Sequence, residues 1–246
     1  MDTRSLSSSE LLSVWEQGQS ETPLQRALLL LAAFCTKETP GDLARLSIGR
    51  RDALLLSLRE QAFGPKFSGL ATCPRCSQRL EISFSSEDIR AVPGIEPGQD
   101  LSLDIGDYAV RFRLPNSLDL MAISDLEDLD AASQALIRRC ILGASHEGEE
   151  ISVDALPETV LEAALKLMNE SDPQANVQLS LSCPECGHEW QSAFDILSFL
   201  WKEIDIWALR TLHDVHKLAS AYGWSEAEIL AMSSWRRQVY LELVSQ

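Results

Sequence analysis

Two matched Cys-Pro-x-Cys pairs constrain the fold of this chain more than any other feature of its sequence. The first is "CPRC" at residues 73–76 and the second is "CPEC" at residues 183–186. Two residues between cysteines let both thiolates of a tight turn point at one ion, while backbone N–H groups donate to the sulfurs. The pattern therefore predicts one structural Zn²⁺, held in a tetrahedron by Cys73, Cys76, Cys183 and Cys186.

Paired cysteines of this kind can also form disulfides, act as redox pairs or bind iron. Disulfides are rare in a reducing cytoplasm, and a redox Cys-x-x-Cys usually opens a helix, which neither pair does. A mononuclear iron site of the rubredoxin type uses the same ligands and stays open as an alternative. Four cysteines leave no coordination position for water, so no catalysis is expected at the metal. His188 is interpreted as a bystander or as a donor to a ligand.

The residues around both pairs alternate between apolar and polar, which is typical of β-strands. Leu80, Ile82 and Phe84 alternate after the first pair, and Trp190 and Phe194 follow the second. Each pair is thus predicted at the tip of a β-hairpin, and two hairpins joined by a metal resemble a zinc ribbon. Because about a hundred residues separate the pairs, metal binding is expected to stabilise the whole central region.

Helix signals precede the hairpins and also lie between them. A Thr22–Gln25 capping box opens a helix predicted to end near Cys35, and a second helix runs from about residue 50 to Gly64-Pro65. The segment between the hairpins contains, in order, a turn-rich connector (91–100), a compact hairpin (101–114), one or two helices (115–143) with a Ser124–Glu127 capping box and Gly143 at the end, an exposed loop (146–150) and a helix (about 157–168).

The C-terminal segment is predicted to be helical and rich in tryptophan. A helix capped by Asp195 runs to Tyr222, and Gly223 ends it. Two shorter helices follow, the last over about residues 234–244. Aromatic residues and arginine are enriched at interface hot spots, so this segment is interpreted as partner-binding through Trp224, Trp235, Arg236, Arg237 and Tyr240. The alternative is that the aromatic residues form the core of a helical subdomain.

These elements together predict an α+β protein, mainly helical, with a zinc-ribbon-like pair of hairpins and a helical C-terminal tail. The predicted domains are N-terminal helices (1–66), zinc-ribbon-like hairpins (67–195) interrupted by an inserted hairpin and helices (85–175), and an aromatic-rich helical tail (196–246).

Charge and apolar length exclude several classes of partner. The formal net charge of −16 argues against nucleic acid, because phosphate contacts need clustered Lys and Arg. The longest apolar run, Ala27–Cys35, is shorter than the about 20 residues that span a bilayer, so no membrane insertion is expected. The N-terminus lacks a secretory signal pattern, which predicts a cytoplasmic protein.

An enzyme is not expected. The chain has no phosphate-binding loop, no dinucleotide fingerprint and no G-x-S-x-G elbow, and no small-molecule substrate is predicted. His213 and His216 are interpreted as residues on the polar face of a helix, because a third metal ligand is not evident.

Two stretches carry a family resemblance. "LHDVHKLASAYGWSEAEILAMSSWRRQVYLELV" (212–244) resembles the C-terminal pattern of baseplate hub assembly chaperones of contractile-tailed phages and contractile injection systems. "FRLPNSLDLMAI" (112–123) is similar to the middle of that family, where R-L-P leads into D-L. The paired cysteines resemble those of the longer, zinc-knuckle-bearing members.

The resemblance implies a non-enzymatic chaperone that holds hub, spike or tail proteins during assembly in a bacterial or phage-infected cytoplasm. Two other functions stay open: a zinc-ribbon adaptor or regulator that binds other proteins, and a permanent structural subunit of the baseplate.

Overall fold

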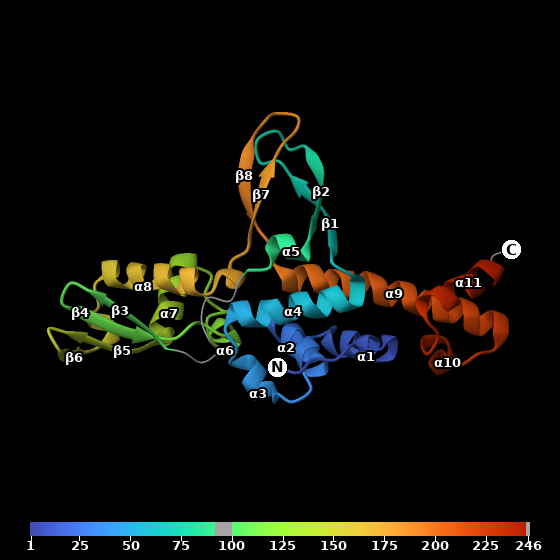
Figure 1. The fold of residues 1–246 in the computed structure, drawn as a ribbon, viewed down its shortest axis with the longest axis horizontal. Helices are drawn as coiled ribbons and strands as arrows, with labels where there is room; N and C mark the ends of the chain where they lie inside the picture. Colours follow the sequence, from blue (N-terminus) through green and yellow to red (C-terminus); the bar gives the residue numbers. More distant parts are fainter. Residues whose placement is uncertain (92–99, 245–246) are drawn as a thin grey trace. The chain divides into compact units, whose positions relative to one another are not determined.

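The computed structural model of the chain describes residues 1–91 and 100–244. Helix accounts for 55% of it and strand for 20%, which confirms the α+β, mainly helical prediction. The helices in Figure 1 are α1 (Ser8–Gly18), α2 (Pro23–Phe34), α3 (Pro40–Ala44), α4 (Ile48–Phe63), α5 (Ser86–Ile89), α6 (Ser117–Ala122), α7 (Leu129–Cys140), α8 (Glu158–Ser171), α9 (Ile196–Tyr222), α10 (Glu226–Leu230) and α11 (Ser234–Val244), with short 3₁₀ turns η1 (Val153–Ala155) and η2 (Pro173–Ala175).

The strands form three separate antiparallel sheets. They are β1 (Lys66–Thr72) with β2 (Arg79–Ser85), β7 (Gln178–Ser182) with β8 (Glu189–Ala193), and a four-stranded meander of β3 (Leu101–Ile105), β4 (Tyr108–Phe112), β5 (Ile141–His146) and β6 (Glu149–Ile151). Most of the predicted turn-rich connector at 91–100 lies outside the described residues.

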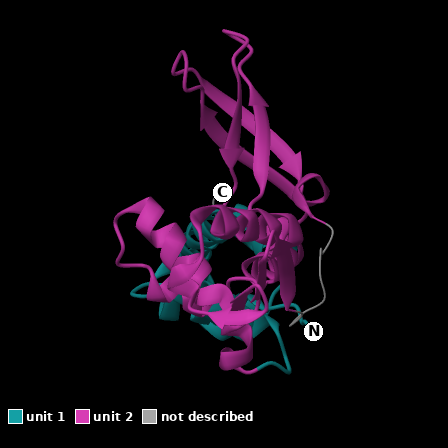
Figure 2. Ribbon diagram, turned by 90° about the vertical axis from the view of Figure 1, so that its left-hand side faces the viewer, with its two compact units in different colours: residues 1–38, 196–246 teal, residues 39–195 magenta. Residues whose placement is uncertain are grey.

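The chain divides into two compact units. Unit 1 joins residues 1–38 to residues 196–246, and unit 2 consists of residues 39–195 (Figure 2). The predicted division into 1–66, 67–195 and 196–246 stays a prediction. Among the described residues, no helix has both the length and the apolar character that crossing a bilayer requires.

Unit 1 is built on one long helix. α9 runs unbroken for 27 residues and ends before Gly223, whose φ of 69° ends the helix as predicted. α1 and α2 both contact α9, and the side chain of Trp201 packs so closely on α1 that a Cβ at Gly18 would lie 2.2 Å from its ring. The C-terminal half of α9 shares a core with α10 and α11, made of the buried residues Leu12, Ala208, Val215, Leu218, Ile229, Leu230 and Leu241.

The four-stranded sheet of unit 2 corrects three sequence predictions. Gly143 does not end a helix but lies within β5, opposite Arg111. The predicted loop at 146–150 is a β5–β6 hairpin whose turn places Glu147 and Gly148 at positive φ. Ser124 and Glu127 form no capping box, because α7 begins later, after Asp128, which accepts from the backbone N–H of Asp130. The run "CILGA" is apolar throughout, so its strand period was hidden.

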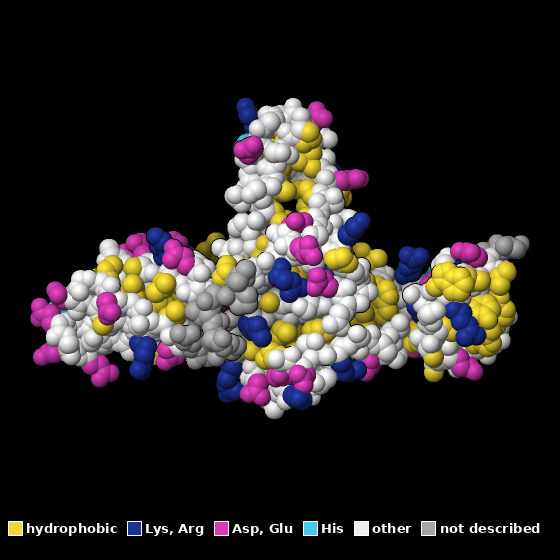
Figure 3. All heavy atoms as spheres, viewed as in Figure 1, with side chains coloured by type: hydrophobic (Ala, Val, Ile, Leu, Met, Phe, Trp, Pro, Cys, Tyr) yellow, Lys and Arg dark blue, Asp and Glu magenta, His cyan; other side chains and the backbone are white. Residues whose placement is uncertain are grey.

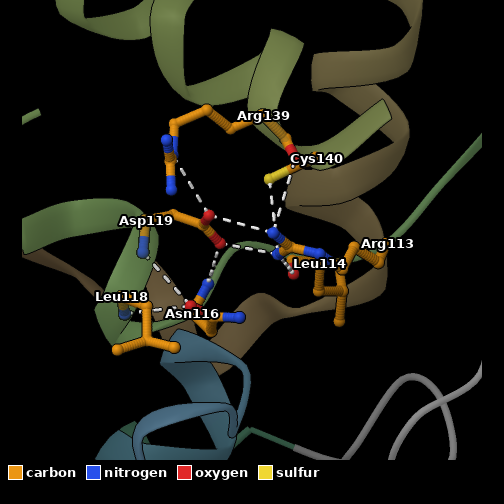
Figure 4. A network of polar contacts seen from close by, with 7 residues as sticks. All are labelled: Arg113, Leu114, Asn116, Leu118, Asp119, Arg139 and Cys140. Carbon is orange, nitrogen blue, oxygen red and sulfur yellow. Dashed lines mark hydrogen bonds and ion pairs between the residues drawn. The ribbon is translucent and has the colours of Figure 1, made fainter. Parts of the chain in front are cut away.

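A buried carboxylate connects β4 to α6 and α7 (Figure 4). Asp119, whose side chain is 2% exposed, accepts two hydrogen bonds from the Arg113 guanidinium at 2.6 and 2.9 Å. Arg139 donates to it at 3.3 Å, and the backbone N–H of Asn116 at 3.0 Å. Desolvation raises the pKa of Asp119, but these hydrogen bonds and the two positive charges outweigh it, so the pKa is lowered overall. This explains why Arg113 and Asp119 stand together in "RLPNSLD".

Replacing Asp119 by alanine is expected to destabilise unit 2 by about 2–3 kcal/mol, because both arginines lose their partner but can still turn to water. The folded pKa lies below the unfolded value of about 3.9, so the stabilisation is complete above that pH and is lost as pH falls through the folded pKa. Urea unfolding between pH 3 and pH 7 measures both effects. The control is Asp154→Ala, which removes an exposed pair with Arg138 and should cost less than about 1 kcal/mol. Equal losses for the two variants would contradict this account.

Candidate metal centre

Each cysteine pair lies at the tip of a hairpin, as predicted (Figure 1). In the first hairpin the register runs from Lys66 opposite Ser85 to Thr72 opposite Arg79, and the knuckle between the strands holds residues 73–78. In the second, Ser182 pairs with Glu189 and the knuckle holds residues 183–188.

The two knuckles have the same backbone structure. In the first, the N–H of Cys73 donates to the carbonyl of Gln78 at 2.9 Å, and the N–H of Ser77 donates to the carbonyl of Cys73 at 2.9 Å. The second repeats this pattern, with Cys183 to His188 at 2.8 Å and Gly187 to Cys183 at 2.9 Å. The fourth residue after each leading cysteine is left-handed, with φ of 60° at Ser77 and 66° at Gly187. The two matched Cys-Pro-x-Cys pairs therefore form a structural repeat.

The four sulfurs meet at the spacing that a tetrahedral metal requires. The Sγ atoms of Cys73 and Cys186 are 3.7 Å apart, and those of Cys76 and Cys183 are 3.6 Å apart. All four lie within 4.8 Å of one another. A tetrahedron with Zn–S bonds of about 2.3 Å has edges of about 3.8 Å, so the sulfurs fit that ion. These separations are far longer than the about 2.05 Å of a disulfide, and all four cysteines are free thiols.

The pKa values of the Cys73 and Cys76 thiols shift in opposite directions. Burial opposes ionisation of Cys73, but backbone N–H groups of Cys76 and Arg75 and the neighbouring thiols lower its pKa to about 7. At Cys76 a hydrogen bond from the Gln78 backbone favours the thiolate, but desolvation and the other sulfurs raise its pKa to about 12. The opposite shifts at Cys73 and Cys76 show that ionising one of these two thiols opposes ionisation of the other unless a cation compensates. A divalent ion is the group that would let every sulfur carry its charge.

An aromatic cluster joins the same two hairpins at their bases. Phe67 of β1 and Phe84 of β2 stack with their ring centroids 4.9 Å apart. Phe194, which follows β8, meets both rings edge-on at 5.6 and 5.4 Å. Phe67 is fully buried, and the Arg59 guanidinium of α4 lies 3.8 Å above its ring. The two hairpins therefore meet around the four cysteines at their tips and pack by apolar contact at their bases. The matching positions of Phe84 and Phe194 were visible in the sequence, but the role of Phe67 was not.

The histidines and the predicted partner-binding residues do not belong to the four-cysteine cluster. His188 stacks on Trp190 with ring centroids 6.0 Å apart, and it contributes its backbone carbonyl to the knuckle. His213 and His216 are exposed on α9. The five predicted partner-binding residues belong to unit 1: Trp224 and Tyr240 are half-buried, Trp235 and Arg236 are exposed, and Arg237 is buried.

Comparison with known proteins gives one family. The profile of the family described as T4 bacteriophage base plate protein matches residues 6–201. The matched span includes both knuckles and the whole of unit 2, and it ends early in α9. No curated protein and no solved structure shows a significant match to the chain.

Proposed function

The chain belongs to the T4 bacteriophage base plate protein family, and from that premise we propose that it is a non-enzymatic assembly chaperone for the hub or spike of a contractile tail or injection system. The family match over residues 6–201 is the observation that carries the proposal, because it indicates a baseplate-associated role, structural or in assembly. Of a structural role and an assembly role, the proposed chaperone function specifies the second.

The proposal assigns the four cysteines a structural Zn²⁺. Cys73, Cys76, Cys183 and Cys186 would supply all four ligands, which leaves no position for substrate or water. The ion would hold together the tips of two hairpins whose cysteines Cys76 and Cys183 are 107 positions apart in the sequence. Its role would be to keep unit 2 folded while the protein binds a partner.

A chaperone of this kind needs a surface for apolar contact with an unassembled subunit. The C-terminal helices supply large exposed apolar side chains: Trp235 is 77% exposed and Leu243 is 55% exposed. Because assembly must later displace the chaperone, its interface with the partner should be of moderate size. Baseplate hub, spike or tail proteins are the proposed partners, and neither nucleic acid nor a small-molecule substrate is expected.

Affinity capture of the tagged protein from its native lysate, identified by mass spectrometry, tests this function. The proposal predicts recovery of hub, spike or tube proteins from fractions that contain incomplete tails. The control is the same capture with Arg111→Glu, a change at an exposed residue of β4, which should recover the same proteins. Recovery of transcription machinery in place of tail proteins would overturn the proposal and favour a zinc-ribbon adaptor.

A further inference from the structure

One side of α11 faces solvent with large apolar side chains. Successive residues of an α-helix are rotated by about 100°, which places Trp235, Arg236, Val239, Tyr240 and Leu243 within one arc, here called the α11 outer face. Arg237 and Leu241 point the other way and are buried. In Figure 3 hydrophobic side chains gather over α11 and the adjoining end of α9, with a Lys or Arg side chain among them.

The α11 outer face rests on a packed aromatic base. Tyr222 stacks on Trp224 with ring centroids 4.4 Å apart, and Trp224 meets Tyr240 edge-on at 4.8 Å. Rings held in this way lose little conformational freedom when a partner binds, which favours affinity. The exposed residues of α11 are thus presented by a pre-organised surface.

The α11 outer face carries one arginine, Arg236, and Glu242 lies at its border. The Arg236 guanidinium lies 5.7 Å from the centroid of the Tyr240 ring. Among the ion pairs of residues 1–91 and 100–244, none involves Arg236 or Arg237. Arg237 is 6% exposed, and its Nη1 has no hydrogen-bond partner. The carboxylate of Glu242 accepts a hydrogen bond from the Gln238 side chain at 3.2 Å.

Arg236 places an exposed positive charge on an apolar face of a chain whose formal net charge is −16. The Arg236 guanidinium is exposed and has no carboxylate partner among the described residues, so a carboxylate of another protein can pair with it. Arg237 lies on the opposite, buried side of α11 and does not contribute to this face. An acidic segment would be repelled by most of the surface of this protein but attracted here. Aromatic and aliphatic side chains around Arg236 would bury the apolar part of such a segment.

We propose that the α11 outer face binds an acidic segment that carries large apolar side chains, on the baseplate protein that the chain assists. This inference rests on the proposed function and adds to it the chemistry of the contact. α11 also lies beyond residue 201, where the family match ends, so the contact belongs to a part of the chain that the family profile does not include.

A suitable probe is present in the chain itself. Residues 123–131, "ISDLEDLDA", contain four carboxylates and the exposed Leu126 and Leu129. A labelled peptide of this sequence, titrated with the full-length protein and followed by fluorescence anisotropy, measures binding of acidic apolar chemistry. A second peptide has lysine in place of every Asp and Glu, and a third has serine in place of both leucines.

The acidic apolar peptide is expected to bind at least about tenfold more tightly than either altered peptide. Arg236→Glu and Trp235→Ala should each weaken its binding by about tenfold or more, while Arg111→Glu should leave it unchanged. Circular dichroism and metal content establish that each variant is folded. Equal binding of the acidic and lysine peptides, or unchanged binding by Arg236→Glu, would overturn the proposal.

Two further results separate this inference from its premise. A dimer in sedimentation that Arg236→Glu dissociates would make a second copy of the chain the occupant and overturn the proposal. In lysate capture, baseplate proteins recovered equally by wild type and Arg236→Glu would preserve the proposed function and reject this face as the contact. Peptide binding that needs Arg236, with no baseplate protein captured by wild type, would support the acidic-segment site and reject its assignment to a baseplate partner.

Discussion

Cys183→Ser is expected to lose the proposed Zn²⁺ and the cooperative unfolding of the two knuckle hairpins. The serine leaves three thiolates at a place where the two hairpin tips meet through their sulfurs, with Cys73 next to Cys186 and Cys76 next to Cys183. Structural zinc sites contribute about 10–16 kcal/mol of apparent binding free energy in zinc-finger peptides at neutral pH, which is comparable to the stability of a whole domain. Metal analysis of the purified protein and thermal unfolding with and without chelator measure the two losses.

Two matched variants control this experiment. Cys35→Ala removes a buried cysteine of unit 1 outside the cluster and should retain one zinc per chain. Cys183→His replaces one ligand type by another that zinc accepts, so part of the metal should return. Full stability of the wild-type protein after complete removal of metal would contradict the stapling role. Iron in place of zinc would preserve the four-cysteine site and correct the identity of the ion.

Gly49→Ala is expected to destabilise unit 2 by about 2–4 kcal/mol, because the position has no space for a side chain. Gly49 lies in the first turn of α4, where its N–H donates to Oδ2 of Asp172 at 2.8 Å. A Cβ there would lie 2.0 Å from Oδ1 of Asp172 and 2.9 Å from the backbone nitrogen of Ala175. Relief would require moving a backbone atom as well as the carboxylate that joins α4 to η2.

Gly143→Ala is the matched control, since its Cβ would meet no heavy atom within 4 Å and its φ is not positive. That change should alter stability by less than about 1 kcal/mol. Urea unfolding of both variants at one pH and with zinc present makes the comparison. Similar midpoints for the two alanine variants would show that the contact between Gly49 and Asp172 is not a constraint on unit 2.

Local signals predicted the helices and hairpins well where the chemistry of a few adjacent residues decides the structure. The Thr22–Gln25 capping box, the stop at Gly64 and the end of α9 at Gly223 are all confirmed, because each depends on contacts within one turn. The knuckles were predictable for the same reason, since ligand spacing within a turn is a local property.

Elements and contacts that depend on residues far apart in the chain were harder to predict from the sequence. β5 and β6 were not predicted as strands, because β5 follows α7 directly and is apolar over a span too short to show a period. β5 pairs with β4, which precedes it by about thirty residues, and β6 pairs with β5. In the sequence Phe67 looks like any other strand residue. The fold alone places the rings of Phe84 and Phe194 against it. The contact of Asp172 with Gly49 spans 123 positions and left no signal in either segment.

The outward orientation of Trp235 likewise depends on tertiary structure. Trp235, Val239 and Leu243 recur at helical spacing along the last helix, but a core and a binding face give the same spacing. The structure buries Arg237 and Leu241 instead, and Trp235 stays 77% exposed. An exposed apolar side of this kind favours the binding interpretation over the core alternative for this tryptophan.

The most direct test of the chaperone assignment is the abundance of this protein along the assembly pathway. Quantitative mass spectrometry would compare incomplete tail fractions with purified mature particles, using a tube protein as the reference for copy number. The account predicts that the chain accompanies hub or spike proteins in the incomplete fractions and is absent from mature particles. A fixed number of copies in every mature particle would contradict it and identify the chain as a permanent subunit of the baseplate.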